Sequence, residues 1–209
     1  MKRYPKTEQY DPAWICENWM GPNPLWLLEE LCQHLDLKPG MKVLDLGCGQ
    51  GLTSVFLARE FGVTVFATDL WIEASDNLRR FEQAGVADRV FPIHAEAHAL
   101  PYARDFFDAA IAIDSYQYFG ADELYFPCTF SRLVKPGGQL GIVTTILYVS
   151  QTAGNLLWGW FADRQGYRPS LLIGQAGFVL YLVLAFLARD AWLTYIMTAI
   201  YGLANAANA

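Results

Sequence analysis

The first 143 residues alternate between two hydrophobic patterns. Apolar residues at helical spacing predict four helices, at Leu25–Leu37, Leu52–Phe61, Ile72–Ala84 and Glu123–Val134. Short apolar or β-branched runs predict five strands, at Lys42–Leu46, Val63–Thr68, Val90–His94, Ala109–Ile113 and Leu140–Val143. Strands that alternate with helices are typical of a parallel sheet covered on both faces, so we expect a doubly wound α/β fold.

Two segments of this region follow neither pattern. Met1–Pro24 is rich in Pro, Tyr and Trp and has no clear period, so we expect an irregular arm or a lid. Lys135–Gly138 is predicted to form a turn before the last strand, because Pro and Gly interrupt regular structure.

The pattern changes beyond Val143. Gln139–Ala162 carries no charge over 24 residues, and Ser170–Ala188 and Ala191–Ala209 carry none over 19 residues each. Segments near this length can span a bilayer as helices, and the alternative is buried core helices. A domain this small cannot bury three helices that are apolar all round. We therefore expect two domains: residues 1–143, and residues 144–209 as all-α transmembrane hairpin segments.

Charge follows the same division. Met1–Gly138 holds 19 of the 21 acidic and 12 of the 15 basic residues. An acidic domain is a poor partner for nucleic acid, so none is expected. The four cysteines form no CxxC pair, and we expect no metal site. The N-terminus lacks the apolar core of a signal peptide, so this domain is expected to face the cytoplasm from a membrane-bound chain.

The chemistry of the first domain centres on a glycine-rich turn between a predicted strand and a predicted helix. Its pattern is Asp45-x-Gly47-Cys48-Gly49-x-Gly51. Glycines let a backbone bend tightly and approach a ligand without Cβ clashes. Asp69 lies 18 positions after Gly51, where nucleotide-binding folds place an acidic residue for the ribose hydroxyls.

Three interpretations of this turn are open. A dinucleotide fold would require a third glycine or alanine at the position that Leu52 fills. A glycine turn without any ligand is the second. The third is S-adenosylmethionine, because the pattern Asp-x-Gly-x-Gly-x-Gly resembles motif I of the class I S-adenosylmethionine-dependent methyltransferases.

The resemblance extends over residues 25–143 and implies a Rossmann-like sheet. Glu96-Ala97 matches the acidic and small pair that contacts the adenine amine in that family, and Phe106–Asp108 matches the entry into its fourth strand. Leu133–Gly138 matches the turn before its fifth strand. The resemblance implies that S-adenosylmethionine is bound by ten residues: Asp45, Gly47, Cys48, Gly49, Gly51, Asp69, Leu70, Glu96, Ala97 and Asp114.

Methyl transfer from a sulfonium needs little acid–base assistance, because the leaving group is neutral and alignment does most of the work. The candidate catalytic residues, Asp114 and Tyr116, follow the fourth strand. Asp114 could accept a proton from the nucleophile, or instead cap the strand end or hold the cofactor's ammonium. His94 and His98 are interpreted as structural. Within the family, the chain is most similar to enzymes acting on small-molecule or lipid-like acceptors, such as the ubiquinone-biosynthesis and cyclopropane-synthase types.

A second resemblance lies in the apolar part. Gly159–Arg168 resembles the G-x-x-x-D-R-x-G-x-R loop between two helices of major facilitator superfamily transporters, on their cytoplasmic side. That placement would put the methyltransferase domain outside the cell, whereas an inside domain would force the Arg-bearing loop outside. Because a complete class I fold continues after its fifth strand, the sheet is expected to be truncated, and a gene fusion, frameshift or assembly artefact near Val143–Ile146 would explain both features.

The sequence thus predicts a membrane-tethered S-adenosylmethionine-dependent methyltransferase for a small-molecule or lipid-like acceptor. Two alternatives belong to other classes: a membrane transporter fragment, and a nonfunctional fusion whose N-terminal domain only binds the cofactor.

Overall fold

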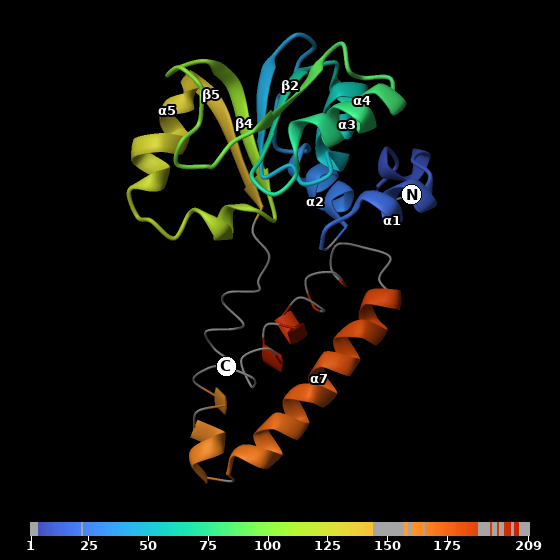
Figure 1. The fold of residues 1–209 in the computed structure, drawn as a ribbon, viewed down its shortest axis with the longest axis vertical. Coiled ribbons are helices and arrows are strands. Elements are labelled where there is room, and N and C mark those ends of the chain that lie inside the picture. The colour runs from blue at the N-terminus through green and yellow to red at the C-terminus, as the bar shows by residue number, and fades with distance from the viewer. Residues whose placement is uncertain are drawn as a thin grey trace. The chain divides into compact units, whose positions relative to one another are not determined.

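The computed structural model describes residues 4–21, 23–143, 157–158, 160–164, 166–187, 193, 196, 199–201 and 203–204. Two compact units, Met1–Thr144 and Thr145–Ala209, divide the chain (Figure 1). Each unit is described by itself.

A five-stranded sheet forms the centre of the first unit. Its strands are β1 (Lys42–Leu46), β2 (Thr64–Asp69), β3 (Val90–His94), β4 (Phe107–Ile113) and β5 (Val134–Val143). They lie in the order β3-β2-β1-β4-β5, and every pair is parallel. The expected Rossmann-like α/β sheet is confirmed. The strand order reverses at β1, and ligands of such sheets bind where the carboxyl ends of the strands flank this reversal.

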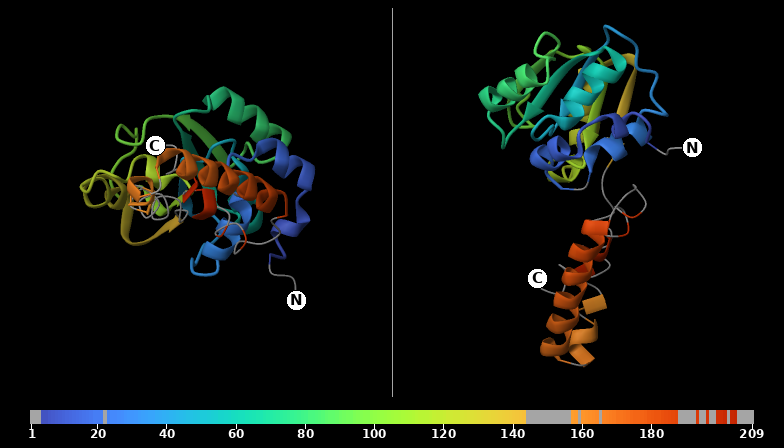
Figure 2. Two further views of the ribbon diagram at one scale, coloured as in Figure 1. Left: turned by 90° about the horizontal axis from the view of Figure 1, so that it is seen from below. Right: turned by 90° about the vertical axis from the view of Figure 1, so that its right-hand side faces the viewer.

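Helices and short helical turns connect the strands (Figures 1 and 2). They are η1 (Thr7–Gln9), α1 (Pro12–Asn18), α2 (Pro24–Leu31), α3 (Leu52–Phe61), α4 (Ala74–Gln83), η2 (Tyr116–Tyr118), η3 (Phe126–Phe130, a π-helical turn) and α5 (Ser131–Leu133). The side chain of Asn23 accepts a hydrogen bond from the Leu25 N–H at 3.1 Å and caps α2, where Pro24 suits the first helical position.

The two faces of the sheet are covered by different elements. Asp45 of β1 bonds with Thr53 and Ser54, so its side chain points toward α3. Successive strand residues point to opposite faces, so Leu44 and Leu46 point away from α3. There they join a buried cluster whose other members come from β4, η3, α5, β5 and the loop after β3: Ala97, Phe107, Ala110, Ala112, Tyr125, Phe130, Leu133 and Val134.

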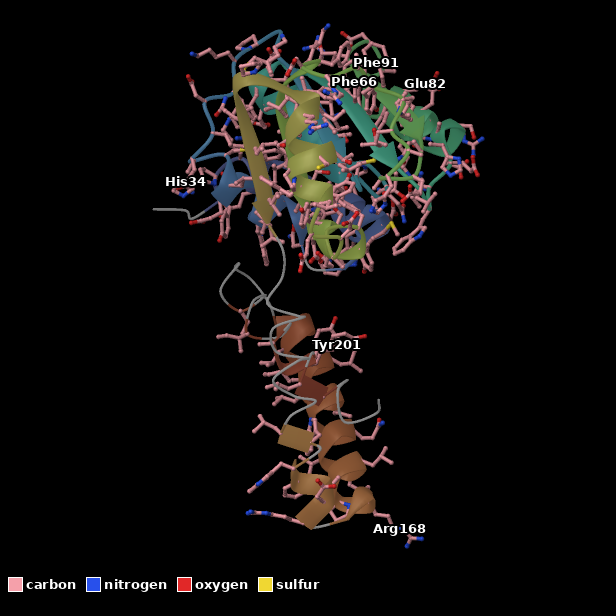
Figure 3. All side chains as sticks on the ribbon, turned by 90° about the vertical axis from the view of Figure 1, so that its left-hand side faces the viewer. His34, Phe66, Glu82, Phe91, Arg168 and Tyr201 are labelled. Atoms are coloured by element: carbon pink, nitrogen blue, oxygen red, sulfur yellow. The ribbon has the colours of Figure 1, made fainter. Side chains whose placement is uncertain are left out.

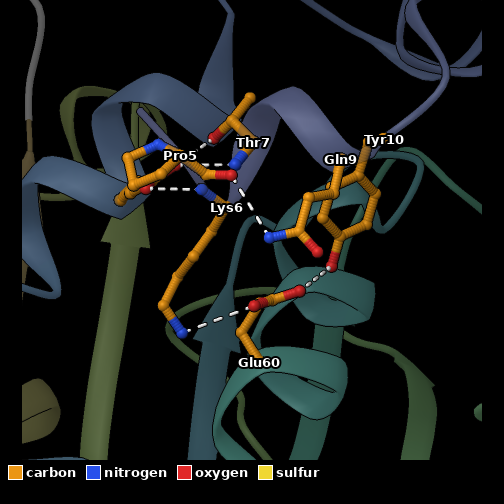
Figure 4. Close-up of polar contacts among 7 residues, drawn as sticks. Pro5, Lys6, Thr7, Gln9, Tyr10 and Glu60 are labelled. Atoms are coloured by element: carbon orange, nitrogen blue, oxygen red, sulfur yellow. Dashed lines mark hydrogen bonds and ion pairs between the residues drawn. The ribbon is translucent and has the colours of Figure 1, made fainter. Parts of the chain in front are cut away.

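The N-terminal arm is attached to the domain by two carboxylates. Buried Glu29 of α2 accepts hydrogen bonds from the Lys6 N–H at 2.9 Å, the Thr7 N–H at 2.8 Å and the Thr7 hydroxyl at 2.6 Å. Glu60 of α3 accepts one from the Tyr10 hydroxyl at 3.1 Å and pairs with the Lys6 ammonium at 3.3 Å (Figure 4). The arm is therefore partly helical and held in place, which its irregular composition did not predict.

Two predicted helices have different bounds in the structure. The first ends at Leu31 rather than Leu37, and the Gln139 side chain bonds the Asp36 N–H at 2.6 Å and its carbonyl at 3.1 Å, which pins this segment to β5. The helix predicted to begin at Glu123 has its first helical element at Phe126.

The turn predicted at residues 135–138 lies within β5. The ladder between β4 and β5 has a register shift at Phe107 and Ala109, and the Lys135 ammonium pairs with Asp108 at 2.6 Å. A bulge accommodates Pro and Gly in a strand, so the KPGG sequence irregularises the strand without ending it.

The second unit contains α7 (Tyr167–Leu187) and helical residues 160–164. Asp163 and Arg164 are therefore helical, although the sequence predicts a loop there; the turn lies at Gly166, with φ of 88°, just before Arg168 (Figure 3). Across this unit the Trp158 indole donates to the Leu203 carbonyl at 2.6 Å.

The membrane prediction receives no support from the second unit. In the part of the chain that the structure describes, no helix is long and apolar enough to cross a membrane. Residues 144–156 and most of 189–209 lie outside the described residues, and with them most of the predicted junction and of the last apolar segment.

Candidate cofactor-binding site

The glycine turn joins β1 to α3 at the carboxyl edge of the sheet. Gly47, Gly49 and Gly51 have φ of 73°, 54° and 81°, a region that residues with a side chain rarely adopt. The Gly47 N–H donates to the Thr68 carbonyl at 2.8 Å, and Gly51 begins the helix. The turn therefore needs glycine at all three positions.

Close packing by the protein adds a second requirement for glycine. A Cβ on Gly47 would lie 2.7 Å from the Ser115 hydroxyl, and one on Gly51 would lie 2.7 Å from the Phe81 ring. A Cβ on Gly49 would meet only Met20, with the sulfur at 3.2 Å. The sequence suggested ligand approach for all three glycines, whereas Gly47 and Gly51 are packed against the protein itself.

Asp69, at the end of β2, ties the turn to the neighbouring strand. One carboxylate oxygen accepts the Gly49 N–H at 2.8 Å, and the other accepts the N–H groups of Trp71 and Ile72 at 2.7 and 3.1 Å. The side chain of Leu70, which follows it, is exposed. A carboxylate offers about four acceptor positions, so Asp69 retains capacity for ligand hydroxyls.

Asp45 lies beneath the turn and is fully buried. One of its oxygens accepts hydrogen bonds from the hydroxyls of Thr53 and Ser54, both at 2.6 Å, whereas Oδ1 has no hydrogen-bond partner among the described residues. Burial raises the pKa of Asp45 to about 6, although the two hydroxyls act in the opposite direction. Burial also raises the pKa of the Cys48 thiol well above its usual range, so Cys48 stays neutral.

Asn77 of α4 completes the support of the turn, and the sequence analysis missed it. This buried amide donates to the Gly49 carbonyl at 2.9 Å and accepts from the Arg80 guanidinium at 3.1 Å. The peptide groups of Gly49 are thus held by Asp69 on one side and by Asn77 on the other. A signal existed, because Asn77 lies four residues before Phe81 and so shares its helix face.

The loop after β3 presents the predicted adenine pair. The Glu96 carboxylate accepts the His98 N–H at 2.8 Å and contacts the His98 imidazole at 2.9 Å, and the hydrogen bond with this side chain lowers the pKa of Glu96. Ala97 is buried, and its carbonyl accepts the Tyr125 hydroxyl at 3.0 Å. His98 is therefore the partner of Glu96 within the loop.

Asp114 and Tyr116, the predicted catalytic pair, point to different surroundings. Asp114 has φ of 52°, a strained value for this residue type, and its carboxylate accepts from the Gln117 amide at 3.2 Å. A Cβ on Gly21 of the arm would lie 3.4 Å from its Oδ2. The ring of Tyr116 instead packs against the buried cluster, 5.9 Å from Phe130 between centroids, and burial raises its pKa. The structure does not bring these two groups together on one reacting atom.

The carboxyl edge suits a cationic ligand by its charge. Residues 47–51, 69–73, 94–100 and 114–120, which follow four of the strands, include no Lys or Arg. They carry the carboxylates of Asp69, Glu73, Glu96 and Asp114. S-adenosylmethionine has a sulfonium, an ammonium and ribose hydroxyls, so this donor set fits it. Among the described residues, no group of three or more His, Cys, Asp and Glu residues could hold a metal ion.

Comparisons with known proteins agree with this geometry. Residues 43–138 match the family described as "Methyltransferase domain". Methyltransferase GfsG of Streptomyces halstedii is 36% identical over 122 residues, which cover 58% of this chain and 44% of that protein. The ubiquinone biosynthesis O-methyltransferase of Sinorhizobium medicae is 32% identical over 148 residues, covering 66% of this chain and 58% of that protein.

A solved structure shows the same fold. Geranyl diphosphate C-methyltransferase from Streptomyces coelicolor A3(2), in complex with Mg²⁺, geranyl diphosphate and S-adenosyl-L-homocysteine, has a TM-score of 0.51 and 27% identity. The similarity covers 56% of this chain and 44% of that one. The chain thus spans about half the length of the relatives that it matches.

The Major Facilitator Superfamily also matches, over residues 105–209. Residues 107–113 and 134–143 of that span are β4 and β5 of the parallel sheet, which is not a transporter structure, so that match has structural meaning only beyond the sheet. The parallel sheet, the glycine turn held by Asp69 and the family match over residues 43–138 together show that the chain belongs, through its first unit, to the S-adenosylmethionine-dependent methyltransferases.

Proposed function

We propose that this chain binds S-adenosylmethionine at the carboxyl edge of its sheet and transfers the methyl group to a small-molecule acceptor. The observation that carries the proposal is the glycine turn fixed from both sides. Asp69 holds the Gly49 N–H at 2.8 Å, and Asn77 holds the Gly49 carbonyl at 2.9 Å. A turn held this way is preorganised, so binding the cofactor costs little ordering.

The proposed roles follow the positions of the side chains. The Asp69 carboxylate accepts the ribose hydroxyls, and exposed Leu70 covers one face of the adenine. Glu96 accepts the adenine amine, with Ala97 beside it. The backbone of Gly47–Gly51 approaches the remainder of the cofactor, while Asp45 and Cys48 support that backbone from below.

Bound S-adenosylmethionine supplies an electrophilic methyl group on a sulfonium whose leaving group is neutral. The task of the chain is therefore to align the acceptor with that methyl group. Asp114 lies at the end of β4, next to β1, and we assign it the acceptance of the nucleophile's proton. The ring of Tyr116 packs in the core, so the proposal gives it a supporting role behind Asp114.

Calorimetry with the full chain and S-adenosylhomocysteine tests the cofactor site. We expect saturable binding that Asp69→Ala weakens by more than tenfold. Asp88→Asn, at an exposed aspartate that pairs with Arg89 outside the site, is the control and should bind as the unchanged protein does. A folded protein that binds no S-adenosylhomocysteine would refute the proposal, as would equal affinity in the Asp69→Ala variant.

We further propose that the second unit attaches the chain to a lipid surface. Its long helix α7 exposes a series of large apolar side chains: Leu172, Ile173, Val179, Leu180, Leu182 and Val183. Exposed apolar area of this kind favours an apolar surrounding. Flotation with phosphatidylcholine vesicles should recover the full chain, and Leu172→Lys together with Val179→Lys should reduce the recovery. Equal recovery of both proteins would refute attachment through α7.

A further inference from the structure

Two exposed aromatic side chains meet above the end of β1. Trp71 and Tyr118 are 63% and 61% exposed, and their ring centroids lie 5.0 Å apart at an interplanar angle of 67°. Trp71 follows β2 and Tyr118 follows β4, and these strands are the two neighbours of β1 in the sheet. The pair therefore spans the carboxyl edge where the cofactor is proposed to bind.

The surroundings of this pair are apolar and acidic. Met20, also exposed, reaches the same edge, because its sulfur lies 3.2 Å from the Cβ position of Gly49. The loops that carry Trp71 and Tyr118 contain the carboxylates of Glu73 and Asp114 and no Lys or Arg. Large exposed apolar side chains that gather at a functional edge are typical of a binding surface.

We propose that Trp71, Tyr118 and Met20 bind the methyl acceptor, and that this acceptor is an uncharged, largely apolar molecule such as a prenyl alcohol. This inference rests on the proposed function and specifies its substrate class. An anionic acceptor would be desolvated beside Asp114 with no cationic side chain to compensate it. The described residues also offer no metal cluster to neutralise a diphosphate. A cationic acceptor would lie next to the positive sulfonium, which repels it.

Three ligands with one isoprenoid chain separate these charge classes: geraniol, geranyl diphosphate and geranylamine. Each is titrated by calorimetry into the full chain saturated with S-adenosylhomocysteine, with and without Mg²⁺. We expect geraniol to bind at least about tenfold more tightly than either charged ligand. Tighter binding of the diphosphate or of the amine overturns the inference, and so does the absence of geraniol binding.

Variants test the place of binding. Trp71→Ala and Tyr118→Ala should each weaken geraniol binding up to about tenfold, because an aromatic contact is lost, while the affinity for S-adenosylhomocysteine changes less. Phe91→Ala removes an exposed aromatic ring on β3 that contacts Phe66 instead, with 5.6 Å between centroids, and should leave geraniol binding unchanged.

The titrations distinguish the two levels of the proposal. A protein that fails to bind S-adenosylhomocysteine refutes the proposed function itself. A protein that binds S-adenosylhomocysteine, but whose geraniol affinity is the same in Trp71→Ala and Tyr118→Ala as in the unchanged chain, refutes only the acceptor site.

Discussion

Replacing Asn77 by aspartate tests whether α4 positions the glycine turn. The two side chains have nearly the same shape, but aspartate removes the donor to the Gly49 carbonyl at 2.9 Å and places a carboxylate against it. The side chain is buried, so water cannot substitute for the lost donor. A buried polar group left without its partner costs about 1–3 kcal/mol.

Part of this cost should fall on the cofactor, because Gly49 also donates to Asp69. If the turn relaxes away from Asp69, the bound state must restore it. A transfer of about 1.4 kcal/mol into binding corresponds to about tenfold weaker affinity. We therefore expect Asn77→Asp to lower the thermal midpoint and to weaken S-adenosylhomocysteine binding about tenfold.

The control must lose a comparable hydrogen bond away from the turn. Thr7→Val suits this purpose, because the buried Thr7 hydroxyl donates to Glu29 at 2.6 Å in the arm. Thermal denaturation and calorimetry on both variants separate stability from binding. If Asn77→Asp and Thr7→Val lose similar stability and both keep the original affinity, Asn77 is only structural and the reasoning fails.

Further predictions concern pH, the turn and the arm. Burial raises the pKa of Asp45 to about 6, so its contribution to stability is greatest below about pH 4 and is lost as the pH rises through 6, by about 3 kcal/mol; urea unfolding of Asp45→Asn across that range should lack this loss. Gly51→Ala should cost about 1–3 kcal/mol because of its φ of 81° and its contact with Phe81, and Phe81→Leu in the same chain should recover part of the thermal midpoint. Glu29→Ala should expose the arm to limited proteolysis, whereas Glu30→Ala should not, and equal cleavage of the two would contradict the role of Glu29.

Much of the candidate site could be predicted from the sequence, because its signals are local. Glycines at 47, 49 and 51 between an apolar strand and a helix predict a tight turn, and the structure has positive φ at each. The spacing to Asp69 works because a strand, a helix and a turn of ordinary length separate two neighbouring parallel strands. The ligand roles of these residues stay predictions until binding is measured.

The supporting residues could not be predicted, because their partners are distant in the sequence. Asn77 is an ordinary polar residue on an amphipathic helix until the fold places it 2.9 Å from the Gly49 carbonyl. Ser115 likewise gains its role by donating to the Leu46 carbonyl at 2.6 Å, across 69 residues. No periodicity contains such pairings.

Element boundaries were decided in the same way. The first helix could continue to Leu37 by its apolar pattern, yet it ends at Leu31 in a segment that Gln139 binds through both backbone groups of Asp36. The sequence by itself determined the parallel α/β sheet and its glycine turn, because hydrophobic period and backbone sterics act within a few residues. The tertiary structure alone decided which polar side chains hold that turn, where helices stop and that Trp71 meets Tyr118, because these depend on contacts between segments that only folding brings together.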